Sequence, residues 1–294
     1  MSEKIKNTTC FIRSRLNILP RRYFTDSSEG TAENGGRPAP EVGIVLGSGL
    51  GALAEMIDVI STLDYSEIPD FPTSTVAGHR GRFIYGRLGG KYVIAMEGRV
   101  HYYEGYPIDE VVLPVRAMCC LGIDTLIVSN AAGGLCPLFE AGDVMVIRDH
   151  INLIPNPLVG PNPEELGVRF PDMGEAYDRK LITLAHEVAR AQGIVLREGV
   201  YVGSSGPSFE TPAEVRYFRR IGGDAIGMST TPEVIVARHQ RVRVLGFSLI
   251  TNVLSGVPAR LCGGAELTHE EVIEAGKRAM PGLCALVREI ITRL

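Results

Sequence analysis

The residues most able to do chemistry gather in the stretch EGRVHYYEGY, residues 97–106, which follows the apolar segment KYVIAM. Arg99, His101 and Tyr103 stand two apart, so in an extended segment their side chains face the same way. Arginine suits two phosphate oxygens, histidine can donate or relay a proton, and tyrosine offers a sugar a flat surface with a hydroxyl. Glu104 could orient Arg99 or His101 from behind, or only cap the following turn. The alternative is a solvated strand end without function.

A glycine-rich turn precedes that stretch in VGIVLGSGLGALAEM, which reads as a strand, a turn and the start of a helix. Gly47, Gly49 and Ala52 fit the G-x-G-x-x-G/A pattern of dinucleotide sites. Asp64 lies at about the right distance to hold a ribose, so a nicotinamide-dependent oxidoreductase is one candidate. A glycine turn at a helix N-terminus nevertheless binds any phosphate, and Ser48 adds a hydroxyl. A tight turn without a ligand is the remaining alternative.

Two later strand ends carry residues suited to a nitrogen heterocycle. In GPSFETPAEV, Phe209 could stack on a flat base while Glu210 accepts a ring N–H. Asn252 ends LGFSLITN, and because an amide both donates and accepts hydrogen bonds, it can read a lactam edge. Each polar residue also has a structural alternative, Glu210 as an acid at a helix N-terminus and Asn252 as a turn residue.

Two further strand ends could bind an anion. DTLIVSNAAGG contains small residues from Ala131 to Gly134 that let backbone N–H groups approach a ligand. DAIGMSTTPEV presents Met228 and Ser229 before a proline-initiated helix, whose N-terminus favours an anion. The alternatives are a tight turn and a simple helix cap.

The elements that must position these residues alternate along the chain from residue 41. Short β-branched runs such as VGIVL, DVMVI and VRVLGFSLITN read as buried strands. Helical patterns lie between several of them, and Pro281 should kink or break the last helix. The alternation predicts an α/β fold: one domain over residues 41–294, with a mixed, largely parallel central sheet flanked by helices. The expected N-caps are Asp109, Asp178, Thr211 and Thr268.

Residues 1–40 differ in composition from the rest. EKIKNTTCFIRSRL can form a short helix with Ile5, Ile12 and Leu16 broadly on one side. TDSSEGTAENGGRPAP is rich in Ser, Gly, Glu and Pro, which predicts a flexible linker or surface insertion. The arginine-rich FIRSRLNILPRRYF could belong to an organelle transit peptide, but the acidic residues around it argue against this. We therefore expect an N-terminal helix plus a flexible insertion.

The overall composition narrows the function classes. The chain has 294 residues and a net charge of −4, which disfavours a sequence-independent nucleic-acid binder. No apolar run reaches the roughly 18 residues that span a membrane. The six histidines show no zinc-site spacing. The six cysteines form no CxxC pair, which favours free thiols in a reducing compartment, the cytoplasm.

Together the motifs resemble the trimeric, low-molecular-mass purine nucleoside phosphorylases. The resemblance covers residues 41–294, and EKIKNTTCFIRSRL looks like the family's N-terminal helix, which would make residues 17–40 an insertion. It implies the nucleoside phosphorylase fold. The motifs that carry it are, in order, GSGLG, AGHRG, GRVHYYEGY, SNAAGG, RDHINL, GPSFETPAE, GMSTTPEVIVARH, LITN and THEEV.

The resemblance also implies a role for each matching residue. The implied phosphate site is Ser48, His79, Arg99, His101, the Ala131 backbone and Ser229. The implied ribose site is Tyr103, Met228 and His269, and the implied purine site is Phe209, Glu210 and Asn252. Catalysis would rest on His101, Glu210 and Asn252. Phe170 resembles a residue that neighbouring subunits lend to each other's ribose pocket, which implies a homotrimer.

The implied reaction is the reversible phosphorolysis of 6-oxopurine (deoxy)ribonucleosides, such as inosine and guanosine. Its products are the free purine and (deoxy)ribose 1-phosphate, as in purine salvage. Inorganic phosphate is a co-substrate, and no cofactor or metal is expected. Methylthioadenosine phosphorylases are similar but carry aspartate where this chain has Asn252, and their activity is the alternative within the family. A nucleoside-binding protein without turnover is another.

Two positions depart from the family pattern. Val253 stands where mammalian members have a lysine, although bacterial-type members often have an apolar residue there. The loop over residues 255–267 is longer than the pattern suggests. The departures bear on base preference and on gating of the site.

Overall fold

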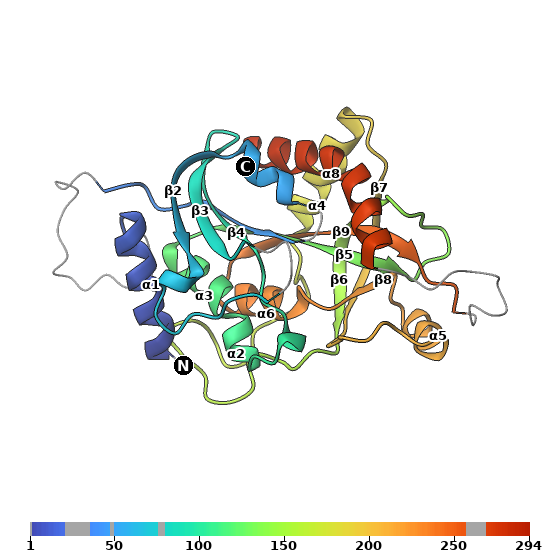
Figure 1. Ribbon diagram of the computed structural model, residues 1–294, viewed down its shortest axis with the longest axis horizontal. Coiled ribbons are helices and arrows are strands. Elements are labelled where there is room, and N and C mark those ends of the chain that lie inside the picture. Colours follow the sequence, from blue (N-terminus) through green and yellow to red (C-terminus); the bar gives the residue numbers. More distant parts are fainter. Residues whose placement is uncertain (1, 21–35, 48–49, 76–79, 257–268) are drawn as a thin grey trace.

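A nine-stranded mixed sheet with the order β2-β3-β4-β1-β5-β8-β7-β6-β9 organises the computed structural model (Figure 1). Strand β9 also pairs with β5, so the strands from β5 to β9 close into a ring. Five pairings are parallel and four antiparallel. The structure describes residues 2–20, 36–47, 50–75, 80–256 and 269–294. The predicted α/β fold with a mixed sheet is confirmed.

The strands share short, apolar sequences. They are β1 (Val42–Leu46), β2 (Asp58–Asp64), β3 (Arg82–Leu88), β4 (Lys91–Glu97), β5 (Thr125–Gly134), β6 (Val144–Asn152), β7 (Leu196–Gly203), β8 (Ala225–Gly227) and β9 (Arg243–Val253). The α-helices are α1 (Ser2–Leu16), α2 (Ile108–Val111), α3 (Leu113–Leu121), α4 (Arg179–Ala191), α5 (Pro212–Arg220), α6 (Thr231–His239) and α8 (His269–Thr292). The described residues also form three short 3₁₀ helices, η1 (Gly51–Met56), η2 (Tyr65–Glu67) and η3 (Tyr102–Glu104).

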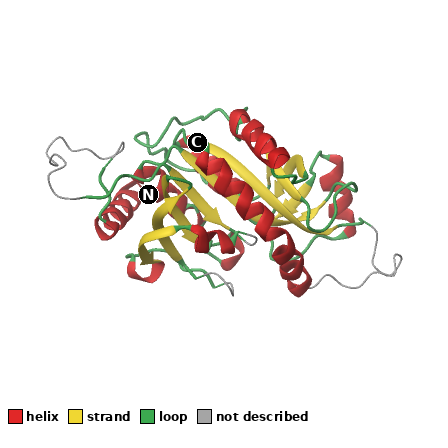
Figure 2. Cartoon of the chain, turned by 90° about the horizontal axis from the view of Figure 1, so that it is seen from above, coloured by secondary structure: helices red, strands yellow, loops and turns green. Residues whose placement is uncertain are grey.

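Helices cover both faces of the sheet. Helices α1, α3 and α6 share one apolar core with the strands, and α4, α8 and η1 share a second. Figure 2 shows the long C-terminal helix α8 lying across the strands. The central strand β1 is buried along its whole length, as its unbroken apolar run VGIVL requires.

Helix ends follow the sequence in most cases. The Asp178 carboxylate accepts from the backbone N–H groups of Lys180 and Leu181, and Thr211 forms a capping box with Glu214, as predicted. The prediction of Asp109 as an N-cap is wrong, because Pro107 takes that position. Thr268 lies outside the described residues.

Two further predictions are settled in part or need correction. Of the predicted kink or break at Pro281, the break is absent, because helix α8 runs from His269 to Thr292 without interruption, and the kink stays a prediction. The glycine turn after β1 leads to the 3₁₀ helix Gly51–Met56 and not to an α-helix.

The N-terminal helix is confirmed as α1, and its predicted apolar side is buried at Ile5, Ile12 and Leu16. Downstream, Ile18 and Arg37 form a parallel bridge, with Leu19 N donating to Arg37 O at 2.8 Å. The chain therefore leaves and returns at one place, so an insertion between these residues closes at a modest entropic cost. Residues 21–35 lie outside the described residues, so the insertion and the boundary at residue 40 stay predictions.

The dinucleotide interpretation of Asp64 does not fit the sheet. This residue ends β2, an edge strand that is antiparallel to β3 and separated from β1 by β3 and β4. A ribose-binding acid of a dinucleotide fold belongs at the end of a parallel strand close to the glycine turn. Asp64 instead caps η2 together with Glu67.

Within the described part of the chain, no helix is long and apolar enough to cross a membrane. The described cysteines, which exclude Cys262, are free thiols. Cys119 and Cys120 are buried in α3, as their apolar setting predicts.

Candidate active site

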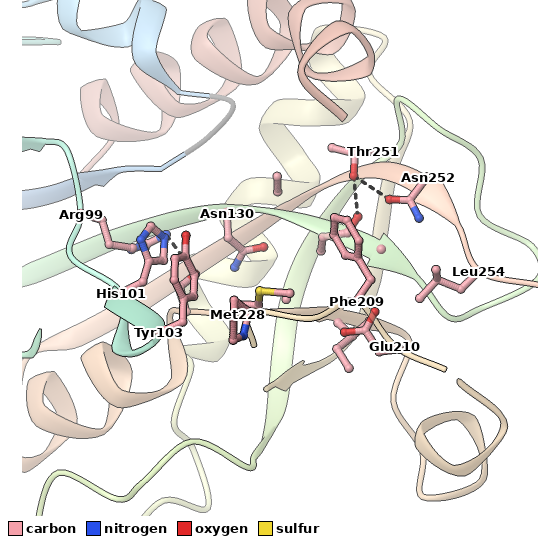
Figure 3. A pocket seen from close by; sticks show the side chains of 17 residues that line it. Arg99, His101, Tyr103, Asn130, Phe209, Glu210, Met228, Thr251, Asn252 and Leu254 are labelled. Carbon is pink, nitrogen blue, oxygen red and sulfur yellow. Dashed lines mark hydrogen bonds between the residues drawn. The ribbon is translucent and has the colours of Figure 1, made fainter. Parts of the chain in front are cut away.

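Five polar strand ends meet at one cavity of about 310 Å³ (Figure 3). Strands β4, β5 and β9 run parallel through β1, and the carboxyl ends of parallel strands share one edge of a sheet. The loop before α5 and the end of β8 complete the wall. The lining residues are Arg99, His101, Tyr103, Asn130, Ala131, Ala132, Gly133, Pro207, Phe209, Glu210, Ile226, Gly227, Met228, Ser229, Thr251, Asn252 and Leu254.

Most of the residues singled out from the sequence line this cavity. The exceptions are of two kinds. Ser48 and His79 lie outside the described residues, and so does the side chain of His269, the first residue of α8. Phe170 lies in a separate hollow with Arg169 and is 85% exposed, so it is available to another molecule.

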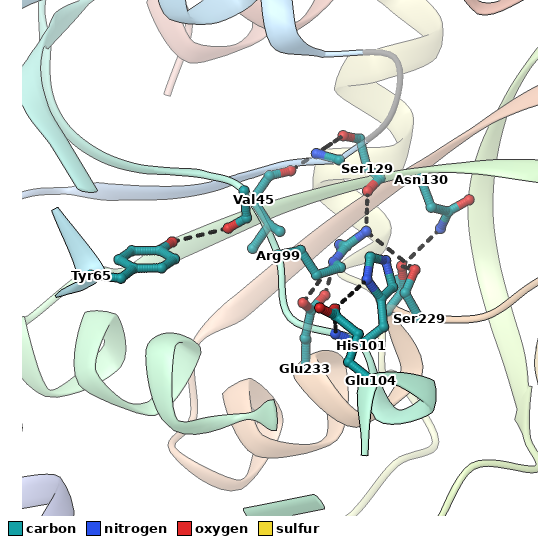
Figure 4. Close-up of polar contacts among 12 residues, drawn as sticks. Val45, Tyr65, Arg99, His101, Glu104, Ser129, Asn130, Ser229 and Glu233 are labelled. Carbon is teal, nitrogen blue, oxygen red and sulfur yellow. Dashed lines mark hydrogen bonds and ion pairs between the residues drawn. The ribbon is translucent and has the colours of Figure 1, made fainter. Parts of the chain in front are cut away.

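Arg99 is held in place by a buried ion pair (Figure 4). Its Nε and Nη2 each donate to one carboxylate oxygen of Glu233 at 2.8 Å, and both residues are only 2% exposed. Its Nη1 donates to Ser129 O at 2.9 Å and to Ser229 Oγ at 3.2 Å. The guanidinium fork expected to clasp phosphate is therefore occupied by Glu233. The arginine contributes a fixed edge to the cavity, because its partners leave it one orientation.

Glu233 was not predicted from the sequence as a site residue. It stands in the apolar run TPEVIVARH, where an acid in the first turn of a helix looks like a partner of the helix dipole. Its burial, which only the structure shows, calls for a charged partner, because a carboxylate is almost never buried without one.

The turn after β1 requires glycine at position 47 because the backbone packs too closely there for a side chain. A Cβ at this position would lie 2.1 Å from Ser129 O and 2.9 Å from Arg99 Nη1. Any larger residue would therefore displace the carbonyl that holds Arg99. The first glycine of the GSG motif serves close packing beside the arginine.

Glu104 orients His101. Its Oε1 accepts from His101 N at 2.7 Å and lies 3.1 Å from His101 Nδ1, while its Oε2 accepts from Thr75 N at 2.6 Å. Burial alone would raise the pKa of the Glu104 carboxyl, but the hydrogen bonds from His101 and Thr75 outweigh it and lower the pKa to about 2. An ionised carboxylate only accepts, so Nδ1 carries the proton and Nε2 is turned away from Glu104.

Both alternatives for Glu104 thus apply at once, since it also closes the capping box of η3. The partner it orients is His101, whose ring stacks on Tyr103 with centroids 4.8 Å apart. The chain leaves β4 at Glu97, and His101 has the predicted extended backbone, but Tyr103 lies in the 3₁₀ helix η3 and so reaches the cavity by a helical turn.

The base-binding candidates lie at the other end of the cavity. Phe209 is 51% exposed, and Glu210 is partly buried. Burial raises the pKa of the Glu210 carboxyl and the charge of Glu214 adds to this, while the backbone N–H of Glu210 opposes it. The acid that serves the N-terminus of α5 is Glu214, which accepts from Thr211 N at 2.7 Å. The structural alternative for Glu210 is therefore taken by another residue.

Asn130 lines the cavity, although no role was predicted for it from the sequence. It is 3% exposed, its Nδ2 donates to Thr230 Oγ1 at 2.9 Å, and among the described residues its Oδ1 has no hydrogen-bond partner. Thr230 precedes α6 with a φ of +70°, and its side chain forms no cap with that helix in the described structure. The alternative of a simple helix cap for this segment is therefore wrong for Thr230, whose hydroxyl accepts from Asn130 of β5 instead.

No group of three or more His, Cys, Asp or Glu side chains lies close enough to hold a metal ion in the part of the chain that the structure describes. The chemistry available at the cavity is that of a fixed cation, an oriented imidazole, hydroxyls, a half-exposed aromatic ring, a partly buried carboxylate and an amide.

The family model described as "Phosphorylase superfamily" matches residues 41–292. Purine nucleoside phosphorylase 1 of Geobacillus stearothermophilus is 52% identical over 257 residues, which cover 87% of this chain and 92% of that protein. Purine nucleoside phosphorylase of Bos taurus is 53% identical over 247 residues, covering 82% and 84%. The solved structure of Schistosoma mansoni purine nucleoside phosphorylase in complex with inosine matches with a TM-score of 0.87 and 39% identity, over 99% of this chain and 96% of that one.

Proposed function

The chain belongs to the phosphorylase superfamily and is a purine nucleoside phosphorylase, and we propose that the cavity described above is its active site. One observation supports the assignment of the two ends of the cavity to different parts of the substrates. A buried arginine with an oriented histidine lies at one end of the cavity, and a carboxylate and an amide line the other (Figure 3). The two ends suit phosphate and a purine, and the space between suits a pentose.

The phosphate end consists of Arg99, His101, Ser229 and the backbone of Ala131. Arg99 supplies positive charge that does not need to be reoriented, because Glu233 and Ser129 already hold it. Once bound at this end, a phosphate oxygen would attack the anomeric carbon of the nucleoside from the side of the sugar opposite the base. Ser48 and His79 would join this end on the strength of their motifs.

The ribose lies between Tyr103 and Met228. The Tyr103 ring is fixed by its stack on His101, and Met228 precedes the Ser229 of the phosphate end. A flexible, apolar methionine and a flat ring fit the faces of a pentose, and the tyrosine hydroxyl can bond to its oxygens. His269 is proposed here from its motif.

The purine end consists of Phe209, Glu210 and Asn252. As the bond from the sugar carbon to the purine nitrogen breaks, its electron pair leaves with the base. Glu210 would accept N1–H of a 6-oxopurine, and the Asn252 amide would contact its O6/N7 edge, stabilising the charge that develops there. Schistosoma relatives crystallised with hypoxanthine, with inosine and with adenosine support a purine at this end, and the preference for a 6-oxopurine rests on Glu210 and Asn252.

We propose a homotrimer in which Phe170 enters the ribose site of a neighbouring subunit. Support comes from its 85% exposure, which is unusual for a phenylalanine, and from the family motif. We also propose a cytoplasmic location, supported by the free thiols of the described cysteines.

The test of the function is hypoxanthine release from inosine with and without inorganic phosphate. Release that requires phosphate and yields ribose 1-phosphate is expected. Hydrolysis at the same rate without phosphate would reject phosphorolysis. A fluorescence titration with NADH, in which no binding is expected, separates this activity from the oxidoreductase alternative.

A further inference from the structure

Thr251 and Asn252 both line the cavity although they are neighbours in strand β9. In a regular strand, consecutive side chains point to opposite faces. The pairing of β9 with β5 explains the exception: Ala132 pairs with Ile250 and Gly133 pairs with Asn252, with an irregularity between them. Thr251 is therefore the extra residue of a β-bulge, a device that re-aims side chains at functional sites.

The bulge brings the Thr251 hydroxyl against the Asn252 amide. Thr251 Oγ1 lies 2.9 Å from Asn252 Oδ1 and 3.3 Å from Ala132 O, and Figure 3 shows both contacts. A hydroxyl has one proton and can donate it to one acceptor at a time. The shorter contact takes the proton, so Oδ1 faces Thr251 and Nδ2 is the end of the amide left for the base.

We propose that Thr251 is a positioning residue that sets base preference by fixing the orientation of the Asn252 amide. The proposal rests on the proposed contact of Asn252 with the purine. A 6-oxopurine presents two acceptors, O6 and N7, which match an N–H donor. A 6-aminopurine presents an amino donor at the same place, which opposes the Nδ2 hydrogens.

Because Ala132 O competes for the same proton, the choice that the Thr251 hydroxyl makes decides which way the Asn252 amide is turned. If the hydroxyl donates to Ala132 O, its oxygen can accept from Nδ2, and the amide turns its Oδ1 toward the base. That orientation suits an amino group. With the hydroxyl removed, both orientations lose their partner and the amide follows whichever base is bound.

The experiment compares Thr251→Val and Thr251→Ala with Thr251→Ser. We measure kcat/KM for inosine and for adenosine at saturating phosphate. Both variants without the hydroxyl should narrow the preference for inosine over adenosine by roughly tenfold, about the value of one net hydrogen bond. Thr251→Ser keeps the hydroxyl and should keep the wild-type ratio.

Ser248→Ala is the matched control. Ser248 lies on the same strand, is fully buried, and its Oγ has no hydrogen-bond partner among the described residues. Its loss should leave the ratio unchanged, and the KM for phosphate should stay the same in all these variants.

Equal losses with both nucleosides in Thr251→Val and Thr251→Ala, or an unchanged ratio, would overturn the proposal. Asn252→Asp distinguishes a failure of the proposed role of Thr251 from a failure of the proposed base contact of Asn252. If that variant shifts the ratio and the Thr251 variants do not, only the role of Thr251 fails. If Asn252→Asp leaves the ratio unchanged, the proposed base contact itself fails.

Discussion

The two ends of the cavity are built in different ways. At the proposed phosphate end, Arg99 bonds to Glu233, Ser129 and Ser229, and His101 is held by Glu104 (Figure 4). At the proposed purine end, Phe209 is half exposed, and among the described residues Asn252 is held by one hydroxyl. The orientation of Arg99 and His101 therefore depends largely on Glu233, Ser129 and Glu104, which are not among the proposed substrate contacts. The purine end depends on the identity of the few side chains that face the base.

The difference is consistent with the ligand that we propose for each end. A phosphate dianion is the same in every turnover, so a fixed cation avoids reorganisation when it arrives. A base differs from its competitors at one or two edge atoms, and single donors and acceptors discriminate between them. Substitutions at the phosphate end should therefore harm folding and turnover together, and those at the purine end should redirect specificity.

The largest effect is expected for Glu233→Ala. Removing one partner of a buried pair leaves the Arg99 charge uncompensated, which should lower the free energy of unfolding by about 3–5 kcal/mol. Denaturant titration measures it, and Glu187→Ala, an exposed acid on α4, is the control with a change of about 0.5 kcal/mol or less.

The double variant Arg99→Met with Glu233→Leu sharpens this prediction. It removes both charges, so most of the stability should return while turnover stays low. If Glu233→Ala is as stable as the control, the pair does not hold this end of the cavity together.

The next effect in size is a change of preference in Asn252→Asp. A carboxylate only accepts, so it should favour the amino group of adenosine and repel O6 of inosine. The ratio of kcat/KM for inosine to that for adenosine should fall roughly ten- to a hundredfold, the range for hydrogen bonds to charged groups. Unfolding midpoints within a few degrees of wild type would show that the purine end tolerates the change. A variant that keeps its preference for inosine contradicts the assignment.

A smaller effect is expected for Glu104→Gln. The pKa of Glu104 is lowered from an ordinary 4.5 to about 2 in the folded chain, so its stabilising contribution is complete above pH 4.5 and lost as pH falls toward 2. The difference in melting temperature between wild type and Glu104→Gln should thus shrink over that interval. A difference that is constant with pH would contradict it. Because His101 loses a charged partner, kcat should also fall by about tenfold.

Much of this site follows from the sequence because it lies at strand ends. Arg99, Glu210 and Asn252 each follow an apolar run, and parallel strands bring such ends together. The fold class follows from the same alternation. What the sequence could not reveal depends on distant partners: Glu233 pairs with a residue 134 positions away, and nothing local marks the pairing.

The bulge at Thr251 could not be predicted from the sequence either, because it also depends on a distant partner, strand β5. A strand pattern assigns alternate residues to opposite faces, and only the register against β5 shows that two neighbours share one. The 3₁₀ helix after the glycine turn was missed because Gly51–Met56 is too short for its apolar pattern to distinguish it from the start of an α-helix.

The division of the cavity into two ends is tested most directly by two-substrate kinetics on a pair of variants. The KM values for phosphate and for inosine are measured in the double variant Arg99→Met with Glu233→Leu and in Glu210→Ala. The first should raise the KM for phosphate far more than the KM for inosine, and the second should do the reverse. Equal changes of both constants in either variant would contradict the division.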